Sequence, residues 1–420
     1  MAHRLRSANR DLMRRMNEAL VLGIVHDFGP ISRSDIADES GLSLAAISSI
    51  AGALIEQGIV IEESRGESTG GRRPILLVIN TAAALVIGVK LTRERIIVAL
   101  TDLGGELVEQ RSRSLGADLS PATVTSALGV LVDELRTAHS NHRFLGLGVG
   151  MAGIVDREHG VCRYSPFLQW RDVPVRQLLE ERVGMPVIVE NDVNALTLAE
   201  RWFGAGAGCL NFMVITLGVG VGMGLMLNGE LYRGGRDGAG EFGHSTVIEG
   251  GPLCNCGKRG CVEAFVGEPA LRRAVCDATG EIITLDVAID RTRAGDERLA
   301  AVFRNAGHVL GLGLAAVINV INPTLVIVGG EGAHFLDLLY PELHQTLVRH
   351  CFADLFEGVE LVVEPWGDDA WARGAASLML DEFFHPPNSR DSAVQERPQR
   401  RGGRIVRPAS LTFPPLVPTG

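Results

Sequence analysis

The sequence predicts an α/β protein with two lobes, preceded by a small winged helix–turn–helix domain. The lobes are predicted by a repeated pattern, in which β-branched apolar runs end in glycines before helical stretches, first around residues 144–202 and again around 211–332. The front domain is predicted by two short helical stretches on either side of Gly41, followed by two short strands. We expect the two lobes to surround a cleft.

The composition agrees with several folded units and narrows the class of protein. A chain of 420 residues, 46% of them hydrophobic, is too long for one ordinary domain. A net charge of −10 argues against a protein that coats nucleic acid over its whole surface, but it allows one small DNA-binding domain. Seven cysteines, no apolar leader and no apolar run of membrane-spanning length predict a cytoplasmic protein without a membrane segment.

Residues 1–80 are predicted to form the winged helix–turn–helix domain. Apolar residues at helical spacing predict a first helix that ends at Gly29-Pro30. A short helix over residues 34–39, the Gly41 turn and a second helix capped by Ser43 follow. Strands over 59–63 and 74–79 enclose a wing at 64–73. A helical hairpin that binds another protein is the alternative interpretation.

The expected recognition helix, residues 43–57, contains no lysine or arginine. Its base-facing candidates are Ser43, Ala45, Ala46, Ser48 and Ser49. Such small side chains can contact base edges or phosphates but cannot make the bidentate arginine–guanine contact. DNA affinity must therefore depend on cations elsewhere. The candidates are the N-terminal arginines, Arg33 and the wing residues Arg65, Arg72 and Arg73.

Alternating strands and helices are predicted to follow from residue 81. The expected strands lie at 85–90, 95–100, 144–149, 186–190, 211–217, 224–227 and 325–328. The expected helices lie at 121–140, 192–202, 269–279, 285–293 and 296–319. Glycines at strand ends allow the backbone to approach a ligand, although some of them could serve only turns. Residues 383–420 are rich in proline and arginine, which predicts a disordered tail, either simply solvated or weakly attracted to nucleic acid.

Residues 240–263 contain one histidine and three cysteines in a short span: His244, Cys254, Cys256 and Cys261. Thiolates and imidazole suit Zn²⁺, and four protein ligands without an open position form a structural site. Gly257 and Gly260 allow the tight backbone that such a loop requires. Three buried, reduced cysteines without a metal are the alternative.

The motifs Glu241-Phe-Gly-His244, Cys254-x-Cys256-Gly-x-x-Gly-Cys261-x-Glu263 and Glu190-Asn-Asp-Val-Asn194 together resemble the ROK family of repressors and sugar kinases. The resemblance covers roughly residues 5–382 and implies an actin/hexokinase-like, two-lobed sugar-binding domain over 81–382. The front segment resembles the winged helix of ROK regulators. The resemblance also implies operator DNA as a partner, a homodimer or tetramer, and a sugar or sugar phosphate as effector.

The sugar-binding residues that the resemblance implies are Gly153, Asn191, Asp192, Glu241, His244 and Glu263. Carboxylates and an amide can bind adjacent sugar hydroxyls in pairs. His244 can ligate zinc through one nitrogen and donate its other N–H to a sugar oxygen. For Asn191 and Asp192 a helix N-cap is the alternative, for the two glutamates a surface position, and for His244 a place in the core.

Two functions compete under this resemblance. A sugar kinase would use Asp192 as general base and glycine loops around ATP. The stretch that resembles the first phosphate loop is Lys90-Leu-Thr92-Arg93-Glu94, which has lost the acidic residue and both glycines of the kinase pattern, and Val219 replaces a threonine in the second loop. We therefore expect a sugar-responsive transcription regulator, most simply a repressor, that does not transfer phosphate.

Overall fold

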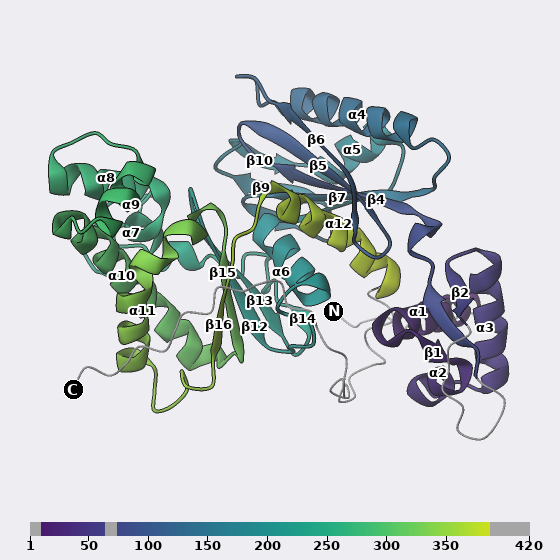
Figure 1. Cartoon of the computed structure of the whole chain (residues 1–420). Helices are drawn as coiled ribbons and strands as arrows, with labels where there is room; N and C mark the ends of the chain where they lie inside the picture. The colour runs from purple at the N-terminus through teal and green to yellow at the C-terminus, as the bar shows by residue number, and fades with distance from the viewer. Residues whose placement is uncertain (1–9, 64–73, 387–420) are drawn as a thin grey trace, which may run out of the picture. The chain divides into compact units, whose positions relative to one another are not determined.

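The computed structural model describes residues 10–63 and 74–386 (Figure 1). These residues form two compact units. The first contains residues up to 149, residues 174–189 and those from 375, and the second contains 150–173 and 190–374. The predicted wing residues Arg65, Arg72 and Arg73, and nearly all of the predicted tail, lie outside the described residues. Strand β11 (Val187–Asn191) and helix α12 (Asp368–Phe384) each run from one unit into the other.

Three helices and a small sheet begin the first unit. The helices are α1 (Arg10–Phe28), α2 (Arg33–Ser40) and α3 (Leu44–Glu56). The sheet has the order β1-β3-β2, from Ile31–Ser32, Leu76–Ile79 and Val60–Glu63. Ser32 and Ser43 cap α2 and α3 with their side-chain oxygens, and Gly41 ends α2 at a φ of 68°. Ile36 and Ile47 are fully buried between these elements, as expected for a helix–turn–helix core.

The large sheet of the first unit has the order β11-β7-β4-β5-β6. Its remaining strands are β4 (Leu85–Leu91), β5 (Arg95–Asp102), β6 (Leu107–Ser114) and β7 (Phe144–Met151). Helices α4 (Pro121–Ala138) and α5 (Val175–Val183) pack together, and α4 contacts β5 and β6. Strand β7 is glycine-rich because α12 passes close to it: a Cβ at Gly148 would lie 1.8 Å from the Ala375 carbonyl oxygen.

The sheet of the second unit has the order β14-β13-β12-β15-β16. Its strands are β12 (Phe212–Leu217), β13 (Val221–Leu227), β14 (Glu230–Leu231), β15 (Leu325–Gly329) and β16 (Glu360–Glu364). Its helices are α6 (Asp192–Phe203), α7 (Glu263–Val266), α8 (Glu268–Thr279), α9 (Leu285–Arg293), α10 (Glu297–Ile321) and α11 (Leu336–His350). A small separate sheet contains β8 (Ile154–Asp156), β9 (Val161–Ser165) and β10 (Trp170–Val173).

The predicted helices and strands are present. The sequence interpretation missed several others, namely α5, α7, α11, α12, β16 and the small sheet of β8, β9 and β10. Helix α10 is long and apolar enough to span a membrane by length and composition, but 56% of its apolar window is buried. Its apolar residues, among them Phe303 and Leu310, belong to the core of the second unit, which accounts for this composition.

Candidate functional site

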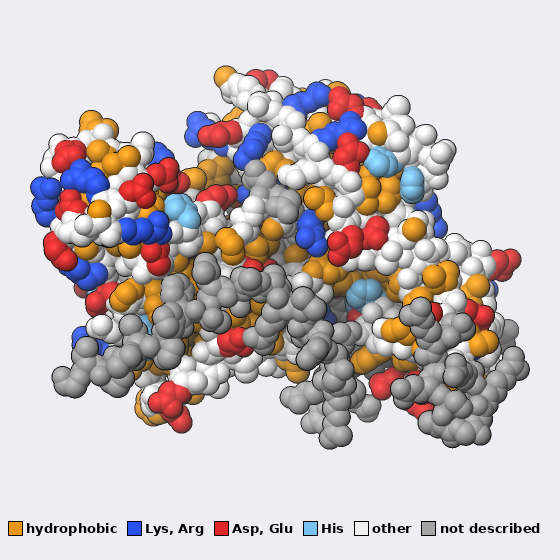
Figure 2. Space-filling view, viewed as in Figure 1, with side chains coloured by type: hydrophobic (Ala, Val, Ile, Leu, Met, Phe, Trp, Pro, Cys, Tyr) orange, Lys and Arg blue, Asp and Glu red, His pale blue; other side chains and the backbone are white. Residues whose placement is uncertain are grey.

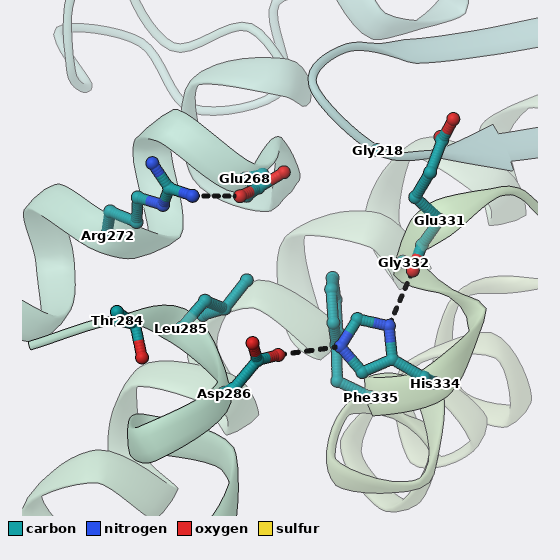
Figure 3. Close-up of a pocket in the computed structure, with 10 residues that line it drawn as sticks. All are labelled: Gly218, Glu268, Arg272, Thr284, Leu285, Asp286, Glu331, Gly332, His334 and Phe335. Atoms are coloured by element: carbon teal, nitrogen blue, oxygen red, sulfur yellow. Dashed lines mark hydrogen bonds and ion pairs between the residues drawn. The ribbon is translucent and has the colours of Figure 1, made fainter.

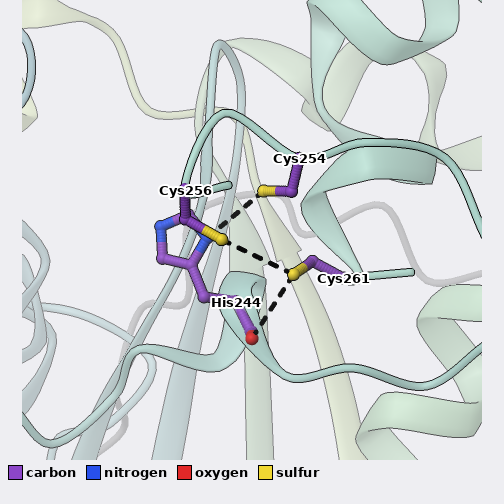
Figure 4. Close-up of side chains that lie close together, drawn as sticks. All are labelled: His244, Cys254, Cys256 and Cys261. Carbon is purple, nitrogen blue, oxygen red and sulfur yellow. Dashed lines mark hydrogen bonds between the residues drawn. The ribbon is translucent and has the colours of Figure 1, made fainter. Parts of the chain in front are cut away.

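The four predicted metal ligands lie together in the structure (Figure 4). One potential ligand atom each of His244, Cys254, Cys256 and Cys261 lies within 4.8 Å of all the others. The Cys254 Sγ is 3.6 Å from the His244 Nδ1, and the Cys256 Sγ is 3.7 Å from the Cys261 Sγ. His244 ends the 3₁₀ helix η2 (Phe242–His244), and the cysteines lie in the loop before α7.

The backbone of this loop explains its glycines. The amide of Gly257 donates to the Cys254 carbonyl at 2.9 Å, and that of Cys254 donates to the Lys258 carbonyl at 2.8 Å, which closes a tight turn. Gly257 has a φ of +88° and Gly260 a φ of +76°. At Gly260 a Cβ would also lie 1.7 Å from the Ile248 carbonyl oxygen, so this position admits only glycine without rearrangement.

The spacing of these donor atoms fits a tetrahedral zinc ion. With Zn–S bonds of about 2.3 Å and Zn–N bonds of about 2.0–2.1 Å, tetrahedral geometry separates two sulfurs by about 3.8 Å and a sulfur from a nitrogen by about 3.6 Å. The observed separations are 3.7 Å and 3.6 Å. Burial raises the pKa of the Cys254 thiol to about 12, so a bound cation would have to displace its proton. The cluster can therefore hold a metal ion, and its donor set is that of a structural zinc site.

Glu241 and Glu263 flank the cluster as the sequence predicted. The His244 Nε2 lies 4.0 Å from a Glu241 carboxylate oxygen, so the nitrogen that does not face the cysteines faces a carboxylate. Burial raises the pKa of Glu241, His244 opposes this shift, and the nearby Glu263 adds to it. Glu263 begins α7, and its Oε2 accepts a hydrogen bond from the Val221 amide at 3.2 Å. The Glu263 carboxylate thus contacts β13 through its Oε2, and its Oε1 lies 3.9 Å from the Cys254 sulfur.

Gly153 and Asn191 form a second contact group. The Asn191 side chain donates to the Gly153 carbonyl at 3.0 Å and accepts from the Asn194 amide at 3.1 Å. It is therefore the N-cap of α6, as the alternative interpretation held, and Asp192 is the first residue of that helix. Gly153 has a φ of +122°, and a Cβ there would lie 2.1 Å from the Tyr164 carbonyl oxygen. The turn can pass so close to β9 only because this residue is glycine.

Both the start of α6 and the segment that contains Glu241 and His244 approach strand β13. A Cβ at Gly222 would lie 2.6 Å from a Val193 methyl group, and Val193 directly follows Asp192. A Cβ at Gly240 would lie 2.1 Å from the Met223 carbonyl, and one at Gly243 would lie 2.1 Å from the Val221 carbonyl. The helix that starts at Asp192 and the segment that contains Glu241 and His244 therefore both approach residues 221–223. Glycines at the contact positions make these approaches possible.

Glu190 and Arg233 are functional candidates that the sequence interpretation missed. The Glu190 side chain is 1% exposed and pairs with Arg233 at 2.6 Å. Its other oxygen accepts from the Asn191 amide at 2.9 Å and the Asn194 side chain at 3.2 Å. The ion pair thus ties the Asn191 turn to the segment that leads to Glu241. Glu190 stands in a recognised motif and could have been noticed, whereas no local pattern marks Arg233.

A cavity of about 190 Å³ lies elsewhere in the second unit (Figure 3). Its lining includes Gly218 of the predicted second phosphate loop, but none of the predicted sugar-binding residues. Glu268, Asp286 and Glu331 contribute carboxylates to it, against the cation of Arg272. A Cβ at Gly218 would lie 2.5 Å from a Glu331 carboxylate oxygen, so a negative charge stands directly beside the glycine loop.

The stretch that resembles the first phosphate loop forms a closed hairpin turn between β4 and β5. The Thr92 hydroxyl accepts from the amides of Glu94 and Arg95, at 3.3 and 3.0 Å, and donates to the Arg95 carbonyl at 2.8 Å. The Thr92 amide also donates to the Arg95 carbonyl. Lys90 is buried at the end of β4. The amides of Thr92, Glu94 and Arg95 are therefore used within the turn.

The predicted base-contacting residues Ser43, Ala45, Ser48 and Ser49 are exposed on α3. The Ser43 oxygen also caps the helix through the Ala46 amide at 3.3 Å. Arg33 pairs with Glu62 of β2 at 2.6 Å, and its side chain is 25% exposed. Because α3 contains no lysine or arginine, its contact with DNA would rely on small neutral groups.

Elsewhere on the molecule, acidic and basic side chains are mixed over α4 and over α8 and α9 (Figure 2).

Comparison with known proteins places these features in a family. The ROK family model matches residues 86–382. The putative xylose repressor of Caldicellulosiruptor sp. (strain Rt8B.4) is 30% identical over 399 residues, which cover 90% of this chain and 99% of the relative. The xylose repressor of Bacillus subtilis (strain 168) is 29% identical over 379 residues, covering 90% of this chain and 98% of that repressor.

Two solved structures extend the comparison. A ROK family transcriptional regulator, described as a homolog of the E. coli MLC protein, superimposes with a TM-score of 0.79 at 25% identity and covers 89% of this chain and 97% of its own. A ROK family glucokinase from Streptomyces griseus, solved with glucose and AMPPNP, has a TM-score of 0.61 at 29% identity and covers 70% of this chain and 99% of its own.

Proposed function

The chain belongs to the ROK family, and from this premise we propose that it is a DNA-binding transcription regulator that responds to a sugar. The observation that carries the proposal is the extent of each match. Repressors match about the whole chain, with 90% of it covered, whereas the glucokinase covers 70% of it and is itself almost fully covered. The chain therefore contains a further part, beyond a kinase-like body, that is shared with repressors. Helices α1 to α3 form a helix–turn–helix arrangement, which suits the DNA-binding domain of a repressor.

We propose that the sugar binds beside β13, between the turn at Asn191 and the segment at Glu241. Asp192, Glu241 and Glu263 supply carboxylates, and the Asn191 turn supplies a rigid edge. A sugar hydroxyl that matches such groups is selected strongly, because an unmatched buried polar group costs roughly 1–3 kcal/mol. The xylose repressors among the relatives make aldopentoses the first class to test, with hexoses and sugar phosphates next.

Zinc is the metal that best suits the cysteine and histidine ligands, and His244, Cys254, Cys256 and Cys261 would hold it. When bound, zinc supplies structural cross-linking of the loop. His244 would ligate through Nδ1, which leaves its Nε2–H to donate toward Glu241 or a sugar oxygen. In this arrangement the loop orients both His244 and Glu263 for the ligand.

Two observations favour a regulator over a sugar kinase. The turn at Thr92 uses its own amides, so it offers little to a phosphate. The Glu331 carboxylate beside Gly218 repels the phosphates of a nucleotide at the second loop. We propose that the sugar is sensed without phosphate transfer. A change between the lobes would then move paired DNA-binding domains relative to the half-sites of an inverted repeat, in a homodimer or tetramer in the cytoplasm.

The test combines DNA binding with an enzyme assay. We expect the full chain to bind DNA from upstream of its own gene in a gel shift at low salt. We expect one aldose to shift the melting temperature in a thermal-shift series and to change the DNA affinity in the gel shift. An ATP-coupled assay across the same aldoses should give no turnover above that of Asp192→Asn. Turnover that depends on Asp192 would establish the kinase instead, and failure to bind any DNA would favour a protein-binding role for residues 1–80.

A further inference from the structure

The first unit contains a second group of potential metal ligands, whereas the cysteine loop belongs to the second unit. His26 and Asp27 are in the last turn of α1, and His385 directly follows α12. The Asp27 Oδ1 is 3.0 Å from the His26 Nδ1, and its Oδ2 is 3.2 Å from the His385 Nε2. All three residues belong to the first unit. The carboxylate thus stands between two imidazoles that are far apart in the sequence.

The surrounding packing holds these side chains in place. The His26 ring stacks on Phe384 with ring centroids 4.4 Å apart and planes 28° apart. A Cβ at Gly23 would lie 3.0 Å from the Phe384 carbonyl oxygen and 3.2 Å from the His385 ring, so α1 approaches the end of α12 closely. The side chains of His26, Asp27 and His385 are 22%, 26% and 16% exposed. The group is sheltered, but water can still reach it.

A further carboxyl group lies next to His385. On the other side of His385, the Nδ1 lies 3.9 Å from Asp381, whose side chain is 8% exposed. A second, buried carboxyl group thus lies beside the three side chains.

We propose that His26, Asp27 and His385 form a second transition-metal site, distinct from the cysteine loop. Two imidazole nitrogens and one carboxylate suit Zn²⁺ and related divalent ions. Neighbouring ligands around a six-coordinate ion with bonds of about 2.1 Å stand about 3.0 Å apart, and around a tetrahedral ion about 3.4 Å. The His26 Nδ1 lies 3.0 Å from the Asp27 Oδ1, and the His385 Nε2 lies 3.2 Å from the Asp27 Oδ2, both within this range. One potential ligand atom of each of the three residues lies within 4.8 Å of the others. Three protein ligands leave the remaining positions to water.

A metal at this position would join the first helix of the proposed DNA-binding domain to the end of the last helix of the sugar-binding domain. Helix α12 packs through Ala375 against β7, so the ion would fix α1 to an element that is itself anchored in the large sheet. The ion would cross-link residues that are 358 positions apart in the sequence. This inference concerns metal content and does not depend on which sugar or DNA the protein binds.

The test is the metal content of the full-length protein after equilibration with zinc and removal of unbound ion. We expect about two equivalents per chain in the unsubstituted protein, and about one in both His385→Asn and His26→Gln. His350→Asn changes an exposed histidine on α11 and should keep both equivalents. In a Cys256→Ser background the remaining equivalent should disappear when His385 is also replaced.

Cobalt substitution provides an independent measurement. Co²⁺ in the cysteine loop should show intense thiolate-to-metal absorption, whereas Co²⁺ at His26, Asp27 and His385 should add only weak bands that are lost in both histidine variants. Using two different variants, each checked for folding by circular dichroism, separates loss of a ligand from misfolding. About one equivalent in the unsubstituted protein, or two equivalents retained in both histidine variants, would overturn the proposal and leave a hydrogen-bonded cluster without metal.

Discussion

The cysteine loop and the group at His26, Asp27 and His385 differ in how the chain brings their donor atoms together. In both, the atoms lie within 4.8 Å of one another. The loop gathers them from residues 244–261 with tight turns and three glycines at positive φ, Gly250, Gly257 and Gly260. The other group joins residues 358 positions apart. A local site can form wherever its turn forms, but a non-local one requires the finished tertiary structure, since closing a long loop costs more entropy.

The two groups also differ in ligand chemistry. Three thiolates and one imidazole leave no open position and favour a soft, closed zinc site. Two imidazoles and a carboxylate leave positions for water and accept a wider range of ions. The loop is therefore expected to brace the sugar-binding residues permanently, and the other group to join two helices by an exchangeable ion.

The largest effect is expected from Cys256→Ser. This exposed cysteine contributes little to packing, so its replacement should remove the loop metal without unfolding the second unit. We expect sugar affinity, measured by calorimetry, to fall at least about 100-fold. Removing an outer partner of a metal ligand already costs about 10- to 100-fold, and removing a ligand itself should cost more. Cys276→Ser, outside the loop, is the control. Loss of metal with unchanged sugar affinity would separate the loop from sensing.

A somewhat smaller effect is expected from Glu263→Gln. The amide keeps the size of the side chain and leaves all four metal ligands in place, so the loop should retain its zinc. Glu263 is partly buried, and loss of its matched carboxylate should weaken sugar binding by roughly 1–3 kcal/mol, or about 5- to 150-fold. Glu249→Gln replaces an exposed carboxylate near the loop and should leave affinity unchanged. Equal affinities in the two variants would place the sugar away from Glu263.

Chelation should distinguish the two groups by rate. A chelator should remove the metal from the three-ligand group at least about tenfold faster than from the closed loop, because water already occupies its open positions. Metal release followed with a colorimetric chelator should therefore be biphasic in the unsubstituted protein and should lose its fast phase in His385→Asn. A fast phase that persists in this variant would assign the exchangeable metal to the loop.

The smallest effect is expected from Glu62→Gln, which leaves both groups intact. Arg33 now pairs with Glu62 at 2.6 Å, and removing that charge frees the guanidinium for a phosphate. We expect DNA affinity to rise about two- to fivefold at low salt. The slope of log affinity against log salt should become steeper by about 0.9, the value for one additional phosphate contact. Glu56→Gln, which changes the net charge equally on α3, is the control. An equal gain in both variants would show only the effect of net charge.

The local features of this protein could be predicted from its sequence. The helix–turn–helix elements, the strands that end in glycine and the cysteine loop all follow from patterns within about 25 residues. The predicted ligands His244, Cys254, Cys256 and Cys261 do lie together. For Asn191 the sequence left two interpretations open, and the structure adds that its side chain caps α6. The sugar and DNA contacts themselves remain predictions.

The sequence by itself therefore determined the fold class, the family and the metal loop, because each depends on residues close together in the chain. Only the tertiary structure placed Arg233 on Glu190, Glu331 beside Gly218, and His385 beside Asp27. These pairs are 43 to 358 positions apart, and no periodicity or spacing links them. They come together only when apolar cores have packed and helices have docked, since the burial of distant surfaces, and not the local backbone, positions them.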